Sequence, residues 1–163
     1  FSTYKGMYFT GDGAKRDENG NYRITGRVDD VVNISGHRIG TAEVEDAINE
    51  HKSVVESAVI GVPHPIKGKS LLAFMIPYNE DIDKKTLKDE VNEIITKMIG
   101  PIAKLDQAII VPGLPKTRSG KIMRRVLRKI ATNDLQNLGD TSTLLNPEIV
   151  DIIIGKVNES QRK

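Results

Sequence analysis

The feature that most constrains the fold is a pair of apolar runs in the middle of the chain, residues 54–62, which are rich in β-branched residues, and residues 71–77. Runs of this length and composition are typical of buried strands. The segment between them, residues 63–69, contains two prolines and a glycine and is typical of a loop. We therefore expect an antiparallel strand pair. Neither run approaches the roughly 20 apolar residues that a membrane-spanning helix needs, so we expect no membrane segment.

Helical periodicity appears on both sides of this strand pair. Thr41 is expected to cap one helix that ends near residues 49–52, and Asp83 a second helix that Gly100 and Pro101 close. The apolar residues at helical spacing are Val44, Ala47 and Ile48 in the first helix, and Leu87, Val91, Ile94, Ile95 and Met98 in the second. Two helices should therefore pack an apolar face on the strands.

The remaining segments predict shorter elements. An Asn-Gly pair at 19–20 lies between strand-like runs at 14–16 and 22–25, which indicates a β-hairpin. The other expected elements are a small strand at 31–34, a glycine-bearing loop at 35–40, a strand at 107–111, a loop at 112–120 and a helix at 122–130. Beyond Thr132 the pattern fades into a polar tail with one apolar run, residues 149–154, and we expect this tail to wrap or fray.

Composition limits the classes of protein that are possible. At 163 residues and 18.0 kDa the chain is one domain with a short appended piece, and 24 basic against 22 acidic residues leave a net charge of only +2. Such a balance does not suggest nucleic acid or a membrane surface as a partner. The absence of cysteine excludes disulfides and thiolate chemistry and fits a cytoplasmic protein. The chain opens on Phe1 without a signal-peptide pattern, so we expect a fragment of a longer chain.

The sharpest local feature is Lys121, which follows Gly120 at the mouth of the helix expected over 122–130. A phosphate-binding P-loop is excluded, because Gly113 lies too far upstream and Ile122 replaces the magnesium-binding hydroxyl. A compact ammonium on a mobile glycine loop suits transient neutralisation of a reacting anion.

Seven basic residues and no acid lie between positions 116 and 129. This basic edge consists of Lys116, Arg118, Lys121, Arg124, Arg125, Arg128 and Lys129. It is either a solvated helix face or the surface of a non-catalytic module that binds RNA or another anion. RNA binding by stacking is disfavoured, since residues 112–132 contain no Phe, Tyr or Trp.

Three further residues, Asp12, Arg27 and Arg38, are weaker candidates for ligand binding. Asp12, beside Gly11 at a strand end, could accept hydrogen bonds from a sugar diol or simply form a turn. Arg27 and Arg38 flank one small strand and could contact a ligand or form surface ion pairs. The three histidines are scattered and no GxSxG turn exists, which argues against a zinc site and a serine hydrolase.

Taken together, the segments 8–12, 24–30, 33–45 and 115–125 resemble the adenylate-forming superfamily, and specifically the C-terminal part of the acetyl-CoA synthetase family. The tail at 137–144 is similar to acetyl- or propionyl-CoA synthetases. The resemblance implies an α+β fold, a small domain with a three-stranded sheet flanked by helices. It implies that residues 1–28 form a β-hairpin from the end of an N-terminal adenylation domain, 29–132 the mobile C-terminal domain and 133–163 a tail.

The resemblance also implies roles for individual residues in an ATP-dependent activation of acetate followed by transfer to CoA. Lys121 would be the adenylation lysine, Asp29 the hinge of domain rotation, and Asp12 the partner of the ATP ribose. The other implied positions are Arg27 and Arg38 at the nucleotide, Ser35 and Gly36 at the pantetheine arm of CoA, and Asn49, His51 and Val54 at a structural magnesium ion.

Implied partners are ATP, acetate, CoA, the chain's own N-terminal domain, and an acetyltransferase and a deacetylase that act on Lys121. Acetylation would remove the Lys121 charge while nearly keeping its length. The fragment alone should not turn over substrate, because the adenine and acyl pockets lie elsewhere. Lys69 and Thr96 depart from the family pattern, and Thr96 and Lys97 lie where relatives contact the CoA nucleotide.

Overall fold

The computed structural model describes residues 5–79 and 81–162, so Phe1 and the rest of residues 1–4 of the predicted segment 1–28 lie outside it. Its strands are β1 (Asp12–Arg16), β2 (Tyr22–Arg27), β3 (Val31–Ile34), β4 (His37–Gly40), β5 (Val54–His64), β6 (Gly68–Pro77) and β7 (Leu105–Ile110). Its α-helices are α1 (Thr41–Asn49), α2 (Lys84–Met98), α3 (Arg124–Ala131) and α4 (Ile149–Gln161). Short 3₁₀ turns are η1 (Val28–Asp30), η2 (Pro101–Ala103) and η3 (Leu135–Asn137). The predicted α+β class is confirmed.

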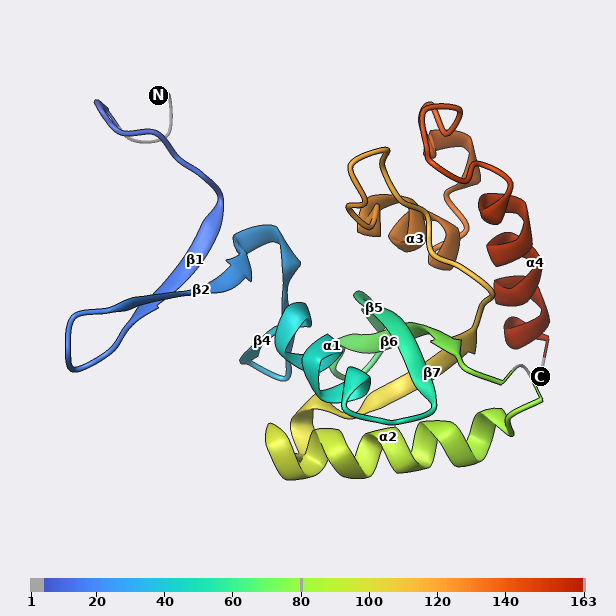
Figure 1. The fold of residues 1–163 in the computed structure, drawn as a ribbon, viewed down its shortest axis with the longest axis horizontal. Coiled ribbons are helices and arrows are strands. Elements are labelled where there is room, and N and C mark those ends of the chain that lie inside the picture. Colours follow the sequence, from blue (N-terminus) through green and yellow to red (C-terminus); the bar gives the residue numbers. More distant parts are fainter. Residues whose placement is uncertain (1–4, 80, 163) are drawn as a thin grey trace.

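A three-stranded sheet in the order β5-β6-β7 organises the main body, with β5 and β6 antiparallel and β6 and β7 parallel. Successive side chains of a strand point to opposite faces, so Val59 and Ala73 pack with α1 and α2, whereas Ile60 and Phe74 pack with α3 and α4. Figure 1 shows α2 running along one side of the sheet and α3 and α4 on the other. Because both faces are covered, β5 and β6 are almost continuously apolar, and the prediction of a sheet flanked by helices is confirmed.

The predicted cap of α2 is confirmed and that of α1 is wrong. Asp83 accepts hydrogen bonds from Thr86 N–H at 2.8 Å and Thr86 Oγ1 at 2.6 Å, so it satisfies the first turn of α2. In α1 the N-cap is Gly40 and Thr41 is the first helical residue. The Thr41 hydroxyl is buried without a hydrogen-bond partner in the described part of the chain.

The glycine-bearing loop predicted at 35–40 is wrong, because residues 37–40 form β4, which pairs with β3. Only Ser35 and Gly36 remain in the turn, with φ of 48° and 86°. Two consecutive positive φ values give a type I′ turn, whose twist matches the flanking strands. The loop between β5 and β6 is likewise shorter than predicted, because pairing extends to His64 and Gly68.

The C-terminal tail was expected to wrap or fray; it packs on the main body through a helix and does not fray. After η3, the apolar run at 149–154 continues at helical spacing to Val157 and forms α4. Ile149, Val150, Ile153 and Val157 are buried against the α3 side of the sheet. The sequence around this run gave little local signal for a helix, because α4 is stabilised mainly by its packing against the main body.

The predicted hairpin is confirmed as β1 and β2, which pair antiparallel with a bulge at Gly13 and Ala14. Figure 1 shows the hairpin projecting from the main body, joined to it through η1. Tyr22 and Ile24 are exposed on β2, and Tyr8 is exposed before β1. Among the helices of residues 5–79 and 81–162, none is long and apolar enough to cross a membrane.

Candidate functional site

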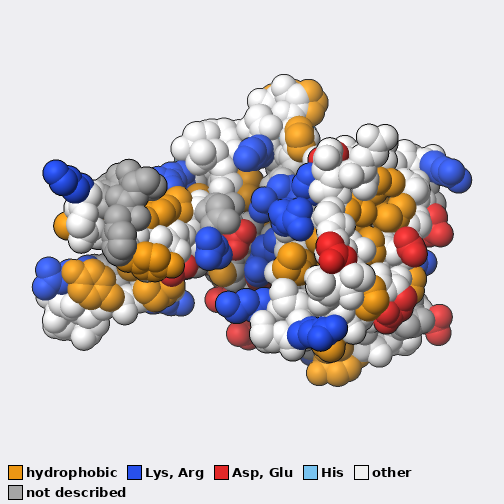
Figure 2. Space-filling view, turned by 90° about the horizontal axis from the view of Figure 1, so that it is seen from above, with side chains coloured by type: hydrophobic (Ala, Val, Ile, Leu, Met, Phe, Trp, Pro, Cys, Tyr) orange, Lys and Arg blue, Asp and Glu red, His pale blue; other side chains and the backbone are white. Residues whose placement is uncertain are grey.

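Lys121 lines a cleft of about 440 Å³ between the hairpin end and the main body. The residues around this cleft come from β2, η1, β5 and the segment before and within α3, and they are Arg27, Asp30, Glu56, Gly120, Lys121, Ile122, Met123, Arg124 and Arg125. Figure 2 shows Lys and Arg side chains gathered between the hairpin on the left and the body on the right. The cleft is therefore an electropositive hollow suited to an anion.

The segment that carries Lys121 is a tight turn rather than an open loop. Thr117 N–H donates to the Lys121 carbonyl at 2.9 Å, Lys121 N–H donates to Thr117 Oγ1 at 3.1 Å, and Gly120 N–H donates to the Thr117 carbonyl at 2.8 Å. Gly120 has φ of +82°, a conformation that side-chain-bearing residues rarely adopt. The Lys121 side chain is exposed, and within the described residues its ammonium makes no hydrogen bond or ion pair.

The folded tail holds this turn in place. Asn146 Oδ1 accepts from Lys116 N–H at 3.3 Å and Asn146 Nδ2 donates to the Leu114 carbonyl at 3.1 Å. Leu145 N–H donates to the Lys116 carbonyl at 2.8 Å, and Thr117 forms a β-bridge with Leu144. Sequence reasoning missed this role of residues 144–146, because the partners lie about thirty positions apart and no local pattern links them.

Most of the basic edge is paired with acidic side chains of the same chain. Lys116 Nζ lies 2.8 Å from Glu56 Oε2, Lys129 Nζ lies 2.9 Å from Asp134 Oδ2, and Arg128 Nη2 lies 3.8 Å from Asp30 Oδ1. Arg124 is paired with Glu45. Four of the seven basic residues thus stabilise the domain internally, which weakens the hypothesis of an RNA- or anion-binding module on residues 116–129.

Glu45 and Arg124 form the most buried of these pairs. Arg124 Nε donates to Glu45 Oε1 at 3.0 Å, Arg124 Nη2 bonds Glu45 Oε2, and Val59 N–H donates to Oε1 at 2.7 Å. Burial raises the pKa of the Glu45 carboxyl, although the hydrogen bonds from Arg124 and Val59 oppose this shift. Glu45 thus joins α1, β5 and α3, a role that no local sequence pattern indicates.

Asp12 and Arg27 lie opposite each other across the hairpin register. The Arg27 guanidinium packs against Gly11, where an added Cβ would lie 3.2 Å from Arg27 Nη2. Asp12 N–H donates to Thr10 Oγ1 at 3.1 Å. Arg27 also lines the Lys121 cleft, so the structure brings Arg27 and Lys121 together, whereas Asp12 is not among the residues that line it.

Arg38, Ser35 and Gly36 form a separate region. Arg38 is exposed on β4 and lines a different hollow, of about 290 Å³, with residues of β1 and α1. Ser35 and Gly36 are exposed at the tip of the β3–β4 turn. Asp29 lies in η1, between the hairpin and β3. The predicted residues thus fall into two groups, one at the hairpin and the Lys121 cleft and the other on the β3–β4 hairpin.

Asn49 ends α1, Val54 begins β5, and His51 lies between them; these are the residues that the resemblance places at a magnesium ion. Asn49 Oδ1 accepts from Ser57 Oγ at 2.9 Å. In His51, Nδ1 accepts from Ser53 N–H at 3.2 Å and Nε2 lies 3.0 Å from Glu90 Oε2, so both ring nitrogens are occupied. Val54 can offer only main-chain oxygen. Among the residues that the structure describes, no group of three His, Cys, Asp or Glu side chains could hold a metal.

Comparison with known proteins places this site in a family. Residues 43–121 match the family model described as the AMP-binding enzyme C-terminal domain, and they belong to that family. The likeness to particular proteins extends over nearly the whole chain. It is 59% identical over 154 residues to acetyl-coenzyme A synthetase of Marinobacter nauticus and 56% identical over 159 residues to that of Vibrio vulnificus. These matches cover 94% and 98% of this chain but only 24% of each relative, so the chain spans about a quarter of their length.

Solved structures agree with this assignment. The acyl-CoA synthetase of Brucella canis is 38% identical with a TM-score of 0.62, and the match covers 82% of this chain and 24% of that one. ATP-bound MatB from Rhodopseudomonas palustris is 31% identical with a TM-score of 0.68, covering 78% of this chain and 25% of that one. The fold is therefore that of adenylate-forming enzymes.

Proposed function

We propose that this chain is the mobile C-terminal part of an AMP-forming acetate–CoA ligase. The observation that carries the proposal is the exposed Lys121 ammonium, which has no partner among the described residues and shares a cleft with Arg27. The similarity of the chain to acetyl-coenzyme A synthetases supports the same proposal. Residues 1–28 would belong to the end of a large N-terminal domain that supplies the adenine and acyl pockets. The chain alone would then be inactive, and acetate, ATP and CoA would be substrates of the whole protein.

In the first half-reaction, an acetate oxygen attacks the α-phosphorus of ATP, pyrophosphate leaves, and acetyl-adenylate forms. Two anions must approach each other, and negative charge accumulates on phosphoryl oxygens, so fixed positive charge at the reacting centre lowers the barrier. Lys121 would supply this charge from its turn. Arg27 would contact the nucleotide from the same cleft, and Asp12 would accept hydrogen bonds from the ribose hydroxyls.

In the second half-reaction, the CoA thiol attacks the acetyl carbonyl and AMP leaves. Ser35, Gly36 and Arg38 lie on the β3–β4 hairpin rather than in the Lys121 cleft, so the two groups can serve one active site in turn. Rotation of the domain about Asp29 in η1 would exchange them. Arg38 would then face the nucleotide phosphates, and Ser35 and Gly36 the pantetheine arm.

Two further roles follow from the proposal. A magnesium ion, if held at the end of α1, would rest on main-chain oxygens of Asn49, His51 and Val54, where the negative end of the helix dipole favours a cation. Its role would be structural, and no step of the reaction depends on it. An acetyltransferase would switch off adenylation by neutralising Lys121, which is exposed, and a deacetylase would restore it.

The test uses the complete protein with Lys121→Ala and Lys121→Gln variants, and Lys104→Ala as a control at another exposed lysine. Both Lys121 variants should lower acetate-dependent ATP–pyrophosphate exchange about 100-fold or more, the scale of losing a charge-stabilising group at a reacting centre. Thioester formation from supplied acetyl-adenylate and CoA should stay near the wild-type rate. Normal exchange in the Lys121→Gln variant would contradict the assigned role.

A further inference from the structure

The β3–β4 turn rests on the turn between β5 and β6. Ser35 N–H donates a hydrogen bond to the Lys67 carbonyl at 3.2 Å, which joins two turns that are thirty-two positions apart. Ser35 and Gly36 both have positive φ, so the turn has a defined conformation that this contact fixes relative to the main body. The position of Ser35 therefore depends on the position of Lys67.

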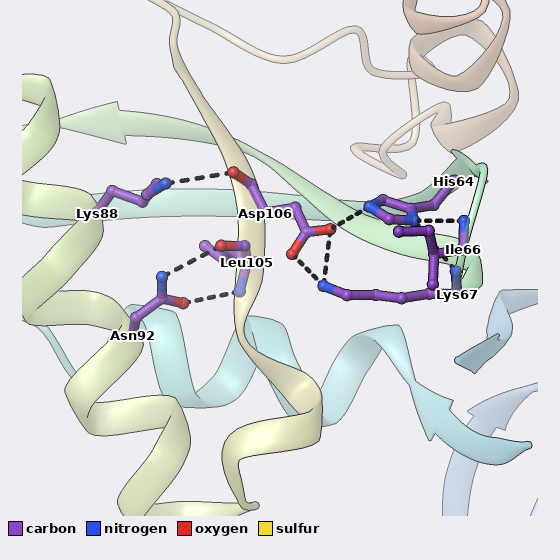
Figure 3. A network of polar contacts seen from close by, with 7 residues as sticks. All are labelled: His64, Ile66, Lys67, Lys88, Asn92, Leu105 and Asp106. Carbon is purple, nitrogen blue, oxygen red and sulfur yellow. Dashed lines mark hydrogen bonds and ion pairs between the residues drawn. The ribbon is translucent and has the colours of Figure 1, made fainter. Parts of the chain in front are cut away.

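Lys67 is itself held by an ion pair to the start of β7. Lys67 Nζ lies 2.8 Å from Asp106 Oδ1 and 3.0 Å from Oδ2, so it bonds both carboxylate oxygens (Figure 3). The Asp106 side chain is 26% exposed and that of Lys67 41% exposed. This partial burial reduces solvent screening of the two charges. Two hydrogen bonds to one ammonium restrict where the turn can lie.

His64 completes the arrangement from the end of β5. Its Nδ1 accepts hydrogen bonds from Ile66 N–H and Lys67 N–H, both at 3.1 Å, so Nδ1 carries no proton. The ring proton then lies on Nε2, which faces Asp106 Oδ2 at 3.6 Å (Figure 3). The imidazole thus holds the backbone of the turn through Nδ1, and its other nitrogen faces the carboxylate.

Helix α2 anchors the acid that these residues share. Asn92 binds both main-chain groups of Leu105, with Oδ1 accepting from N–H at 2.7 Å and Nδ2 donating to the carbonyl at 3.2 Å. Lys88 Nζ donates to the Asp106 carbonyl at 3.2 Å. A continuous set of contacts therefore runs from α2 through Asp106 and Lys67 to Ser35, as the close view in Figure 3 shows for all but the last step.

We propose that His64, Lys67 and Asp106 are positioning residues for thioester formation. This inference rests on the proposed function, in which Ser35 and Gly36 approach CoA. None of the three residues lines the Lys121 cleft, so their effect should be confined to the second half-reaction. A partly exposed ion pair contributes little to global stability, so loss of the contact should change the turn more than the fold.

The experiment uses the complete ligase with Asp106→Asn, Lys67→Met and Lys67→Arg. Lys156→Met, which removes the exposed ion pair with Glu159 on α4, is the matched control. Asp106→Asn and Lys67→Met should each slow thioester formation from acetyl-adenylate and CoA about tenfold, since a misplacement of about 1 Å can cost up to about 100-fold. The rate of ATP–pyrophosphate exchange by the same variants should stay within about twofold of the wild-type rate, because the Lys121 cleft is unchanged. Lys67→Arg should recover much of the lost rate, because it keeps the charge opposite Asp106.

A Gly36→Ala variant separates this proposal from the function on which it rests. Alanine is strained at φ of +86°, so the variant perturbs the turn directly. If Gly36→Ala slows thioester formation while Lys67→Met and Asp106→Asn do not, the positioning role is overturned and the proposed function stands. If Gly36→Ala has no effect either, the role of the turn in CoA chemistry fails, and the positioning role with it. If Lys67→Met and Asp106→Asn slow both half-reactions equally and also lower the unfolding midpoint, the contact is purely structural. This result would also overturn the proposal.

Discussion

Gly61 on β5 and Val32 on β3 lie so close that a Cβ added to Gly61 would meet Val32 Cγ1 at 2.8 Å and Cγ2 at 2.9 Å. Val32 is buried, and Gly61 has ordinary backbone geometry, so the constraint here is space rather than conformation. This contact sets how closely the β3–β4 hairpin can approach the central sheet.

Gly61→Ala should therefore destabilise the protein by about 1–3 kcal/mol, the usual cost of overpacking a core. The free energy of unfolding in urea measures this effect. A Gly61→Ala/Val32→Ala double variant should lose less than the sum of the two single variants, because the smaller side chain relieves the clash. Gly155→Ala in α4, where nothing lies within 4 Å, is the control and should be neutral or stabilising by up to about 1 kcal/mol. Strict additivity of the two changes would argue against the contact.

Glu45→Ala should cost about 3–5 kcal/mol, because it leaves the Arg124 charge unpaired in a half-buried site and removes the acceptor of Val59 N–H. Glu45→Gln should cost less, since its amide oxygen can still accept that bond. Chemical denaturation at neutral pH compares them with Glu159→Ala, which removes an exposed ion pair on α4 and should change stability by no more than about 0.5 kcal/mol. Equal effects of Glu45→Ala and Glu159→Ala would contradict the structural importance of the buried pair.

Ile153→Ala should destabilise by about 2–5 kcal/mol, because Ile153 is fully buried where α4 packs on the sheet. Its neighbour Ile152 is 43% exposed and provides a matched control, for which the same substitution should have a much smaller effect. Thermal unfolding measures both. A negligible effect at Ile153 would restore the original expectation of a frayed tail.

The cap of α2 predicts a dependence of stability on acid. Hydrogen bonds from the Thr86 side chain and backbone lower the pKa of the Asp83 carboxyl below its ordinary value of 3.8. A lowered pKa in the folded state means that the unfolded chain binds the proton first as the pH falls. The stabilisation by Asp83 is therefore complete above pH 3.8 and is lost as the pH falls through the lowered value.

Asp83→Ala should lower the melting temperature at pH 7, and the difference from wild type should shrink on acidification below pH 3.8. Asp83→Asn keeps an oxygen acceptor that does not titrate, so it should remain close to wild type at pH 7 and vary less with acid. Asp81→Asn, a change at an exposed acid nearby, is the control. A difference between Asp83→Ala and wild type that is constant from pH 7 to pH 2 would rule out the titrating cap.

Elements with a local cause could be predicted from the sequence. Asp83 and the apolar residues Leu87, Val91 and Ile95 predict α2, because the capping residue and the apolar face both lie within one short segment. The apolar runs at 54–62 and 71–77 predict β5 and β6 for the same reason. β4 was missed because its turn uses Ser35 at positive φ, where asparagine would be the usual signal. The helical tail was missed because α4 depends on packing against a distant sheet face.

The candidate site divides in the same way. Lys121 stands out locally, since it follows Gly120 at the start of a basic helix, and the resemblance to a family predicts a role for it. The contacts of Asn146 with Lys116 and of Asp106 with Lys67 join residues thirty or more positions apart. No local sequence pattern could predict such contacts. The roles of Asp12, Arg27, Asp29 and Arg38 in nucleotide binding or rotation stay predictions.

The hydrogen bonds of Asn146 give the segment between α3 and α4 an influence on the turn that carries Lys121. Fusion tags, truncations or natural variation near position 146 would alter the geometry of a turn whose key side chain precedes them by twenty-five positions. The segment beyond α3 thus helps to hold the turn that presents Lys121. Forms of the protein that end at different positions should therefore differ in activity when the change reaches this segment.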